Sequence, residues 1–591
     1  MIKRFRASFR HFALYLRDKL SQRQFFILAS IIVGLSSGLA AVILKYFVHY
    51  IETRVTVYSE NYEEFFFFAL CPILGIALTV VFIRHVLKGQ FKKGTAQIVY
   101  AMVKKSSVLP PQQMYTHLIT SAITVGFGGS TGLESPMVST GSAIGSNFAS
   151  TYKLPYKERT ILLACGAAAG IAAAFNAPIA GVLFAVEVLL TDVSASSFIP
   201  LIIAAASGAL MSKMILKGGI VLSFSLTQPF NYHNMPYYIV LGILTGFMSI
   251  YFARIFTWIE HKMGGLKNAW LKIVIGGVSL FALLIVFPPL FGEGYDTIKV
   301  LSNLTPHELT KSSIVHGFIT NDARLLLFLG ALMLLKSIAA AITISSGGNG
   351  GTFGPSLFVG AYLGFIFARL VNMSGFAVIP ESNFTLVAMA GILAGVFYSP
   401  LTAIFLIAEI TGGYELMIPL MTVAALSTVV THYFEPLSME AKKLSGLLKV
   451  NVGDRDKFIL SKLEFEELIE TNFSVLKPEQ DLQSLIKTIA TSSRNIFPVL
   501  NESKELLGVV HLDKIRGIIF NAAEHDDETV NSLMAPPADV ISTDENLHEA
   551  LRKFEDTQQW NLPVLENNKY IGFLSKSSIL TKYRDEFLKS V

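Results

Sequence analysis

The sequence predicts an all-α polytopic membrane protein with an internal repeat, followed by a water-soluble α/β unit on the same chain. Hydrophobic residues make up 52% of the 591 residues and charged residues only 15%, whereas soluble domains carry about 25% charged residues. The charge is also unevenly distributed, because residues 1–450 hold 51 of the 91 charged residues and residues 451–591 hold the other 40. The chain therefore combines a membrane body with a soluble tail.

Charge and cysteine content exclude several classes of protein. The tail carries 16 basic and 24 acidic residues, so it lacks the basic surface that a nucleic-acid partner requires. The two cysteines, Cys71 and Cys165, both lie in apolar stretches. A disulfide framework and a cysteine-rich metal site are therefore excluded, and we expect no metal site.

The first membrane span is predicted at Gln24–Leu44, an uncharged run of the length that a hydrocarbon core of about 30 Å needs. The amphipathic segment 1–24 is basic, which favours a cytoplasmic amino terminus. Phe65–Ile83 should return the chain to the cytoplasmic side, where four basic residues follow within ten positions. We therefore expect a multi-pass protein of the cell membrane.

Later segments fall into two kinds. Uninterrupted apolar runs occur at about 197–212, 236–253, 273–291, 325–346, 382–408 and 416–434. Residues 115–190 and 346–368 are also apolar, but Gly, Pro and Ser interrupt them every few residues. Irregular backbone survives at membrane depth only where protein or a water-filled cavity covers it. Interrupted segments in two halves of a chain are typical of a transporter's binding site.

The two halves correspond in sequence. GGSTGLESP (128–136) aligns with GGNGGTFGP (347–355), at an offset of 219. NAPIAGVLFAVEV (176–188) aligns with YSPLTAIFLIAEI (398–410), at an offset of 222, and pairs Glu187 with Glu409. Two matches in the same order at nearly equal offsets indicate an internal repeat.

These glycine-rich segments predict helix starts that favour an anion. A stretch of this kind that ends in Pro leads into a helix whose first N–H groups have no backbone partner. Those groups and the helix dipole attract negative charge. Glu134 lies inside the first such start, where it fits a capping box with Thr131. An acidic residue at membrane depth is also a functional candidate, and we favour a gate over a cap.

Residues 25–447 resemble the CLC chloride channels and proton-coupled chloride exchangers. The segments GLESP (132–136), GTFGP (351–355) and SPLTAIFLIAEITGGYEL (399–416) match the motifs of that family in order. The resemblance implies an inverted-repeat fold, with repeats at about 65–215 and 236–447, and a homodimer with one pore in each subunit. It also implies that Glu134 is the gate. Backbone N–H groups would bind the anion at Gly132, Leu133, Ser135, Thr352, Phe353 and Gly354.

The sequence departs from the family's pattern at three positions. Lys93 replaces the serine of the intracellular pore motif, and Ser438 falls where the family has an inner tyrosine. The inner proton-carrying glutamate of the exchangers aligns with Val188, beside Glu187. We assign Lys93 and Ser438 to the inner pore, with a headgroup anchor as the alternative for Lys93. Val188 favours passive conduction over proton exchange.

The tail contains a second repeat at residues 473–523 and 538–587, after a linker at 448–472. FPVLNESKELLGVVHLDKI (497–515) resembles LPVLENNKYIGFLSKSSI (562–579), and each half reads as strand, helix, strand, strand and helix. The tail resembles a tandem pair of CBS domains, which implies a cytoplasmic module that in some cases binds an adenine nucleotide. Asp513 would bind the ribose, and a purely dimerising module remains the alternative.

The sequence thus predicts a homodimeric, Glu134-gated chloride pathway in a lipid bilayer, controlled by the tail. It predicts no catalytic residue and no required cofactor. A proton-coupled chloride exchanger remains the alternative. An intramembrane enzyme using serines of the glycine-rich turns is disfavoured, because no Ser–His pair or His–Glu metal motif accompanies them. A non-conducting nucleotide sensor is the last alternative.

Overall fold

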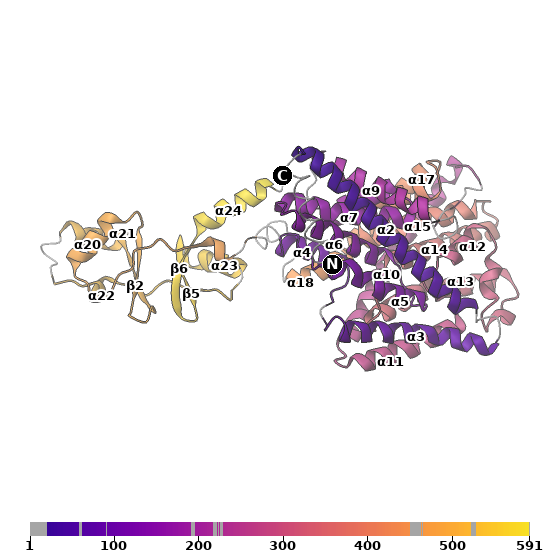
Figure 1. Ribbon diagram of the computed structural model, residues 1–591, viewed down its shortest axis with the longest axis horizontal. Helices are drawn as coiled ribbons and strands as arrows, with labels where there is room; N and C mark the ends of the chain where they lie inside the picture. Colours follow the sequence, from indigo (N-terminus) through magenta and orange to yellow (C-terminus); the bar gives the residue numbers. More distant parts are fainter. Residues whose placement is uncertain are drawn as a thin grey trace, which may run out of the picture. The chain divides into compact units, whose positions relative to one another are not determined.

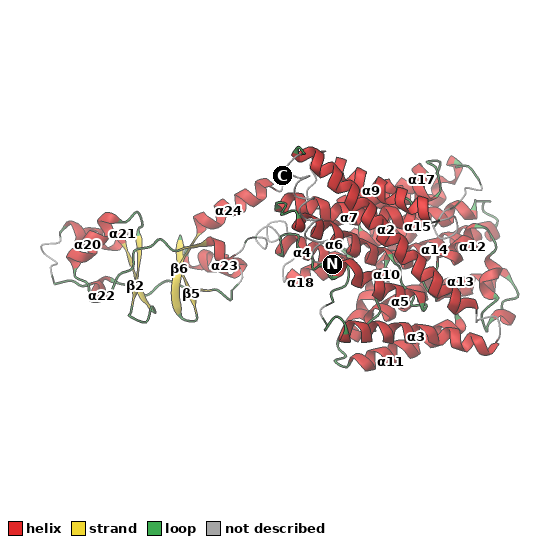
Figure 2. Cartoon of the chain, in the orientation of Figure 1, coloured by secondary structure: helices red, strands yellow, loops and turns green. Residues whose placement is uncertain are grey.

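A computed structural model describes residues 20–57, 62–89, 91–190, 195–216, 222, 224, 228–448, 463, 465–521, 527–545 and 547–589. The chain divides into two compact units, Met1–Leu447 and Leu448–Val591. Figure 2 shows helices throughout the first unit and strands only in the second. The predicted amphipathic segment at 1–24 lies mostly outside the described residues.

The first unit is built from α-helices, with a π-helix after α8 and short 3-10 helices in some of the connecting segments (Figure 1). In chain order they are α2 (Gln22–Val57), α3 (Tyr62–His85), α4 (Thr95–Lys104), α5 (Gln113–Gly126), α6 (Glu134–Thr151), α7 (Tyr156–Phe175), α8 (Pro178–Phe184), α9 (Ala195–Ile215), α10 (Met235–Gly264), α11 (Ala269–Val286), α12 (Tyr295–Ser302), α13 (Asp322–Ser345), α14 (Phe353–Ser374), α15 (Glu381–Phe397), α16 (Pro400–Ile410), α17 (Met417–Phe434) and α18 (Met439–Leu448). Among the described residues, nine helices are long and apolar enough to cross a membrane.

One predicted apolar run is not a single helix. Residues 382–408 divide into α15 and α16, because Tyr398 adopts a left-handed conformation with φ 57° and Pro400 then begins a new helix. The aligned break in the first repeat has the same form, with Asn176 at φ 53° before Pro178. Proline cannot continue a helix, but it fits the first turn of the next one. The two breaks therefore confirm the internal repeat.

Glycines at aligned positions allow close helix crossings in both repeats. A Cβ at Gly145 would lie 2.0 Å from the carbonyl oxygen of Leu162, where α6 crosses α7. A Cβ at the aligned Gly364 would lie 2.2 Å from the carbonyl oxygen of Phe384, where α14 crosses α15. Small residues let membrane helices approach this closely. The same crossing is therefore built twice.

The two repeats also hydrogen-bond to each other symmetrically. The backbone N–H of Ser130 donates to the Thr343 hydroxyl at 3.2 Å, and the N–H of Asn349 donates to the Thr124 hydroxyl at 3.0 Å. At the offset of 219, the donor Ser130 aligns with the donor Asn349, and the acceptor Thr124 aligns with the acceptor Thr343. The repeat is therefore a local two-fold arrangement around the glycine-rich segments.

The second unit has two halves, and in each the helices and strands follow in the order predicted from the sequence. The first half contains α20 (Leu482–Thr491), β2 (Ile496–Leu500), β3 (Leu506–His511), α21 (Leu512–Phe520) and α22 (Val530–Leu533), with Leu476 bridged to Val499 in parallel. The second half contains β4 (Ile541–Ser542), α23 (Leu547–Thr557), β5 (Asn561–Glu566), β6 (Lys569–Ser575) and α24 (Lys576–Lys589).

In the tail, a backbone segment that precedes each half pairs with a strand of the other half. β1 (Ile469–Glu470), which precedes the first half, pairs antiparallel with β6 of the second half. Ala535, which precedes the second half, pairs antiparallel with Val509 of β3 in the first half. Each half therefore completes the sheet of the other, so the pair forms one module.

We expect Gly141→Ala to lower the thermal stability of the detergent-purified protein. A Cβ at Gly141 would lie 2.1 Å from the carbonyl oxygen of Gly166, a backbone atom that cannot move aside without shifting α7. Overpacking of this kind typically costs about 1–3 kcal/mol. Gly330→Ala is the matched control, because a Cβ there meets no atom within 4 Å. Equal melting temperatures for the two variants would contradict the crossing.

Candidate functional site

The site forms where the two glycine-rich segments meet. Gly132 and Gly351 form an antiparallel backbone bridge, with N–H to O distances of 2.9 and 2.8 Å. These two glycines are aligned in the repeat, so each segment binds its own counterpart. A side chain at Gly351 would lie 2.7 Å from the Cβ of Ser135, which explains the need for glycine. The bridge brings the starts of α6 and α14 together.

Glu134 begins α6 and lies between these helix starts. Its side chain is almost fully buried, at 3% exposure, and its Oε1 accepts a hydrogen bond from the Tyr295 hydroxyl. Its Oε2 is buried and has no hydrogen-bond partner among the described residues. This oxygen and the backbone nitrogen of Gly354, in the first turn of α14, both lie beside Gly132, since a Cβ there would be 2.2 Å from Oε2 and 2.9 Å from that nitrogen. The carboxylate therefore stands at the position where the start of α14 would bind an anion.

A second carboxylate occupies the start of α6. The Leu133 N–H donates to Glu293 Oε1 at 3.1 Å, so this N–H is bound to a side chain rather than free for an anion. Two buried lysines surround this region: Lys45 donates to the Ala174 carbonyl, and Lys336 donates to the Gly292 carbonyl at 2.9 Å. Two acids and two lysines are therefore gathered near the start of α6.

Sequence reasoning missed Tyr295, Glu293 and Lys45. Lys45 directly follows the predicted first span, where a basic residue is ordinary. Glu293 and Tyr295 lie between the apolar runs 273–291 and 325–346, in a segment outside the repeat alignment. Lys336 could have been identified from the sequence, because an ionisable residue inside an apolar run such as 325–346 is a functional candidate.

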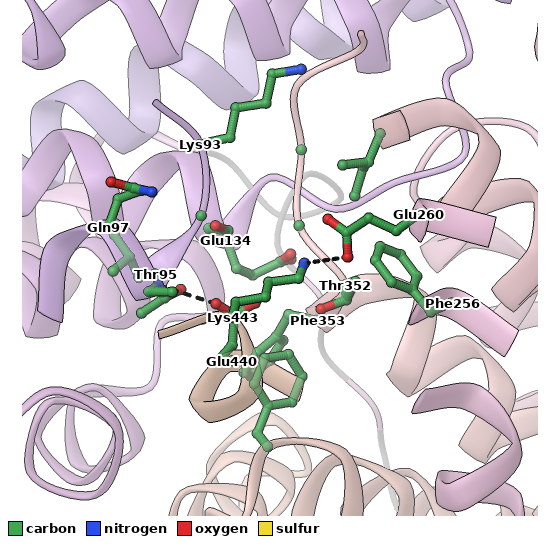
Figure 3. A pocket seen from close by; sticks show the side chains of 18 of the residues that line it. Lys93, Thr95, Gln97, Glu134, Phe256, Glu260, Thr352, Phe353, Glu440 and Lys443 are labelled. Carbon is green, nitrogen blue, oxygen red and sulfur yellow. Dashed lines mark hydrogen bonds and ion pairs between the residues drawn. The ribbon is translucent and has the colours of Figure 1, made fainter. Parts of the chain in front are cut away.

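Two cavities lie close to Glu134. The larger, which we call the α18 cavity, has a volume of about 400 Å³. Its lining includes Glu134, Thr352 and Phe353 together with Glu440 and Lys443 of α18 (Figure 3). The smaller, which we call the α12 cavity, has a volume of about 240 Å³ and is lined by Leu133, Tyr295, Glu293 and Lys45, among others. The hydrogen bond between Tyr295 and Glu134 therefore joins the linings of the two cavities.

The predicted inner-pore residues have different environments. Lys93 lines the α18 cavity, but its ammonium donates to the carbonyls of Gly347 at 2.8 Å and Gly348 at 2.6 Å. Figure 3 shows this ammonium directed away from Glu440 and Lys443. The Lys93 ammonium is therefore bound to backbone carbonyls of the second glycine-rich segment. Ser438 is not among the described residues of the cavity lining; its hydroxyl accepts from the Ala441 N–H at 3.2 Å and caps α18.

The paired glutamates of the repeat cap helices reciprocally. The two carboxylate oxygens of Glu187 accept from Leu401 N–H at 3.0 Å and Thr402 N–H at 2.7 Å, at the start of α16. Those of Glu409 accept from Ile179 N–H at 3.0 Å and Ala180 N–H at 2.9 Å, at the start of α8. The aligned pair therefore has a structural role, because each carboxylate caps a helix start in the other repeat. Val188 follows Glu187 and is partly buried against the apolar core.

Asp513 lies at the second position of α21, and its carboxylate pairs with Arg516 one turn later at 3.0 Å. Both side chains are largely exposed, at 80% and 62%. The acid is therefore accessible to a ligand, although its own helix supplies a competing cation. Among the described residues, no group of three or more His, Cys, Asp or Glu side chains is arranged to hold a metal ion.

Comparison with known proteins gives a family match for each unit. Residues 75–432 match the voltage gated chloride channel family, and residues 530–585 match the CBS domain. The chloride channel protein CLC-f of Arabidopsis thaliana is 25% identical over 545 residues, covering 79% of this chain and 68% of that protein. The voltage-gated ClC-type chloride channel ClcB of Escherichia coli is 28% identical over 321 residues, covering 53% and 71%.

Solved structures share the fold. A slow cyanobacterial Cl⁻/H⁺ antiporter superimposes with a TM-score of 0.63 at 21% identity, over 73% of this chain and 99% of that one. A eukaryotic CLC transporter superimposes with a TM-score of 0.61 at 18% identity, over 96% and 98%. These likenesses confirm the inverted-repeat helical fold predicted from the sequence.

We expect Glu187→Gln and Glu409→Gln each to lower thermal stability. An amide keeps one acceptor oxygen but presents an NH₂ group to the second backbone N–H, and a hydrogen bond to a charged group contributes about 1.5–3 kcal/mol. Glu308→Gln is the control, because its exposed carboxylate has only a 3.9 Å ion pair with Lys311. Unchanged melting in both repeat variants would show that the capping is dispensable.

Proposed function

The chain belongs to the voltage-gated chloride channel family, and from this premise we propose that it conducts chloride through a pathway gated by Glu134. In this proposal the tandem CBS pair controls the pathway from the cytoplasm. The observation that carries the proposal is the position of the Glu134 carboxylate, at two converging helix starts and between two cavities. An anion that replaced this carboxylate would meet the same backbone dipoles.

The proposed pathway runs from the α18 cavity, past Glu134, to the α12 cavity. Chloride enters the α18 cavity and reaches the starts of α6 and α14, where Ser135 and Thr352 are part of the lining. There the Glu134 carboxylate competes with it for the helix ends, so passage requires that the side chain swing away or take up a proton. Tyr295 holds the carboxylate in place through Oε1 and lies on the far side, in the lining of the α12 cavity.

Passive conduction is favoured over proton exchange by the residues at the position of the exchangers' inner glutamate. Val188 cannot titrate, and both oxygens of the adjacent Glu187 accept backbone N–H groups of α16. A carboxylate fixed by two donors is a poor proton carrier. The alternative is a proton-coupled chloride exchanger, and the fold shared with a Cl⁻/H⁺ antiporter keeps that alternative open.

We further propose a homodimer in the cell membrane. Glu187, Glu409 and the helix starts that they cap lie near exposed apolar side chains, including Ile179 at 39% and Leu401 at 47%. Polar groups at such a position need shelter from lipid, and a second copy of the chain would supply it. The amino terminus and the tail would be cytoplasmic, and an adenine nucleotide at Asp513 would be a regulatory ligand.

Chloride efflux from liposomes, recorded together with internal pH, tests the proposal. We expect chloride to leave down its gradient with no stoichiometric proton movement, because the position that would pass protons is Val188. Sustained uphill proton pumping driven by the chloride gradient would instead establish the exchanger. Absence of efflux from well-folded protein would contradict both transport functions.

We expect Glu134→Gln to raise chloride flux and to abolish most of its dependence on pH. The neutral amide loses the charge that competes for the helix ends, and it cannot titrate. Tyr295→Phe is the companion variant, because it leaves the carboxylate in place but removes its hydrogen bond; its flux should rise while remaining pH-dependent. If Glu134 were only a helix cap, Glu134→Gln would cost about 1 kcal/mol of stability and leave the pH profile intact.

A further inference from the structure

Glu440 brings a negative charge into the cavity that chloride would enter. It lies in the first turn of α18, and its side chain lines the same α18 cavity as Glu134 (Figure 3). A carboxylate in an anion pathway repels the permeating ion, so its position requires a reason. The contacts of Glu440 supply one.

The carboxylate of Glu440 binds a helix start from another part of the chain. Its Oε2 accepts from the Ala96 N–H at 3.1 Å, in the first turn of α4. Gly94, which precedes α4 with φ 89°, gives that helix no side-chain cap of its own. The start of α4 also lines the α18 cavity, through Thr95 and Ala96. Glu440 therefore stands at the helix start that borders the pathway.

Nearby cations do not neutralise Glu440. Lys443, one turn later on α18, pairs with Glu260 at 3.2 Å and lies over the Phe256 ring. Lys93 donates to two glycine carbonyls and points away. Within the described part of the chain, no Lys, Arg or His nitrogen lies within 4.0 Å of the Glu440 carboxylate. Its charge is therefore directed at the cavity and the α4 start.

We propose that Glu440 is a second, charge-based gate at the α18 end of the pathway. Its carboxylate occupies the start of α4 as that of Glu134 occupies the start of α14, and it opposes chloride entry into the α18 cavity. Both gates act by the same physics, but they belong to different helices, α6 and α18, that line the same cavity. This inference rests on the proposed chloride pathway through Glu134.

The first test is Glu440→Gln in the full-length protein reconstituted in liposomes. The amide keeps the size of the side chain and one acceptor oxygen for the Ala96 N–H, but it removes the charge. We expect chloride efflux at low ionic strength to rise about fivefold, the factor that corresponds to about 1 kcal/mol, the interaction of two unit charges about 4 Å apart in water. The gain should shrink at high salt, because partly exposed charges are screened.

The matched control is Glu435→Gln. Glu435 is a nearby carboxylate outside the described lining of the α18 cavity, and Arg254 and Lys442 both pair with it. A general effect of lost negative charge near α18 would raise efflux in this variant too, and that outcome would overturn the specific role of Glu440. We expect efflux from Glu435→Gln to equal that of the wild type.

The second test changes the sign of the charge at position 440 and measures the effect on chloride efflux. Glu440→Cys is modified in detergent with a sulfonatoethyl or a trimethylammonioethyl methanethiosulfonate, and then reconstituted. The native Cys71 and Cys165 are both buried, so they contribute little background. We expect the anionic adduct to slow efflux and the cationic adduct to speed it, relative to the unmodified cysteine variant. A purely structural cap predicts the same effect from both adducts, which would overturn the gate.

The experiments distinguish failure of the proposed Glu134 pathway from failure of the proposed Glu440 gate. If neither the wild type nor Glu134→Gln releases chloride, the proposed pathway is wrong and the second gate is overturned with it. If both release chloride as expected, while Glu440→Gln matches the wild type and the two adducts act alike, only the second gate is overturned.

Discussion

The backbone bridge between Gly132 and Gly351 is the constraint on which the site depends. At membrane depth, a backbone that leaves the helical conformation must find partners for its N–H and C=O groups. The two glycine-rich segments solve this problem for each other, because each binds its aligned counterpart. Only glycine permits this approach, since a side chain at Gly351 would meet Ser135. The bridge fixes α6 and α14 with their first N–H groups converging on one point.

Those first N–H groups explain a second regularity of the membrane body. Carboxylates from elsewhere in the chain accept from the starts of α4, α6, α8 and α16, and Glu134 stands beside the start of α14. A helix start favours negative charge, whether it comes from a side chain or from an ion. A side chain that occupies such a start therefore competes directly with a chloride ion. Occupation by carboxylates is both a way to stabilise the fold and a way to block a pathway.

The number of donors distinguishes these two roles. Glu187 and Glu409 each accept at least two backbone N–H groups and lie away from the described cavity linings, so they hold the repeats together. Among the described residues, Glu134 is held by one hydroxyl, while its second oxygen has no hydrogen-bond partner, and Glu440 is held by one N–H. Both of these line the α18 cavity. Weaker attachment beside a cavity is what a movable or displaceable group requires.

The sequence by itself determined the membrane body, the internal repeat and the tail pair, because each follows from local composition or from self-similarity. It also singled out Glu134, an acid inside a glycine-rich apolar segment. It did not reveal Tyr295, Glu293 or Glu440, whose partners are Glu134, Leu133 and Ala96. These contacts join residues more than 150 positions apart, and no local pattern encodes them. It also placed Lys93 near the pathway without showing that two glycine carbonyls bind its ammonium. Only the packing of the two repeats decided which helix start each charged side chain could reach.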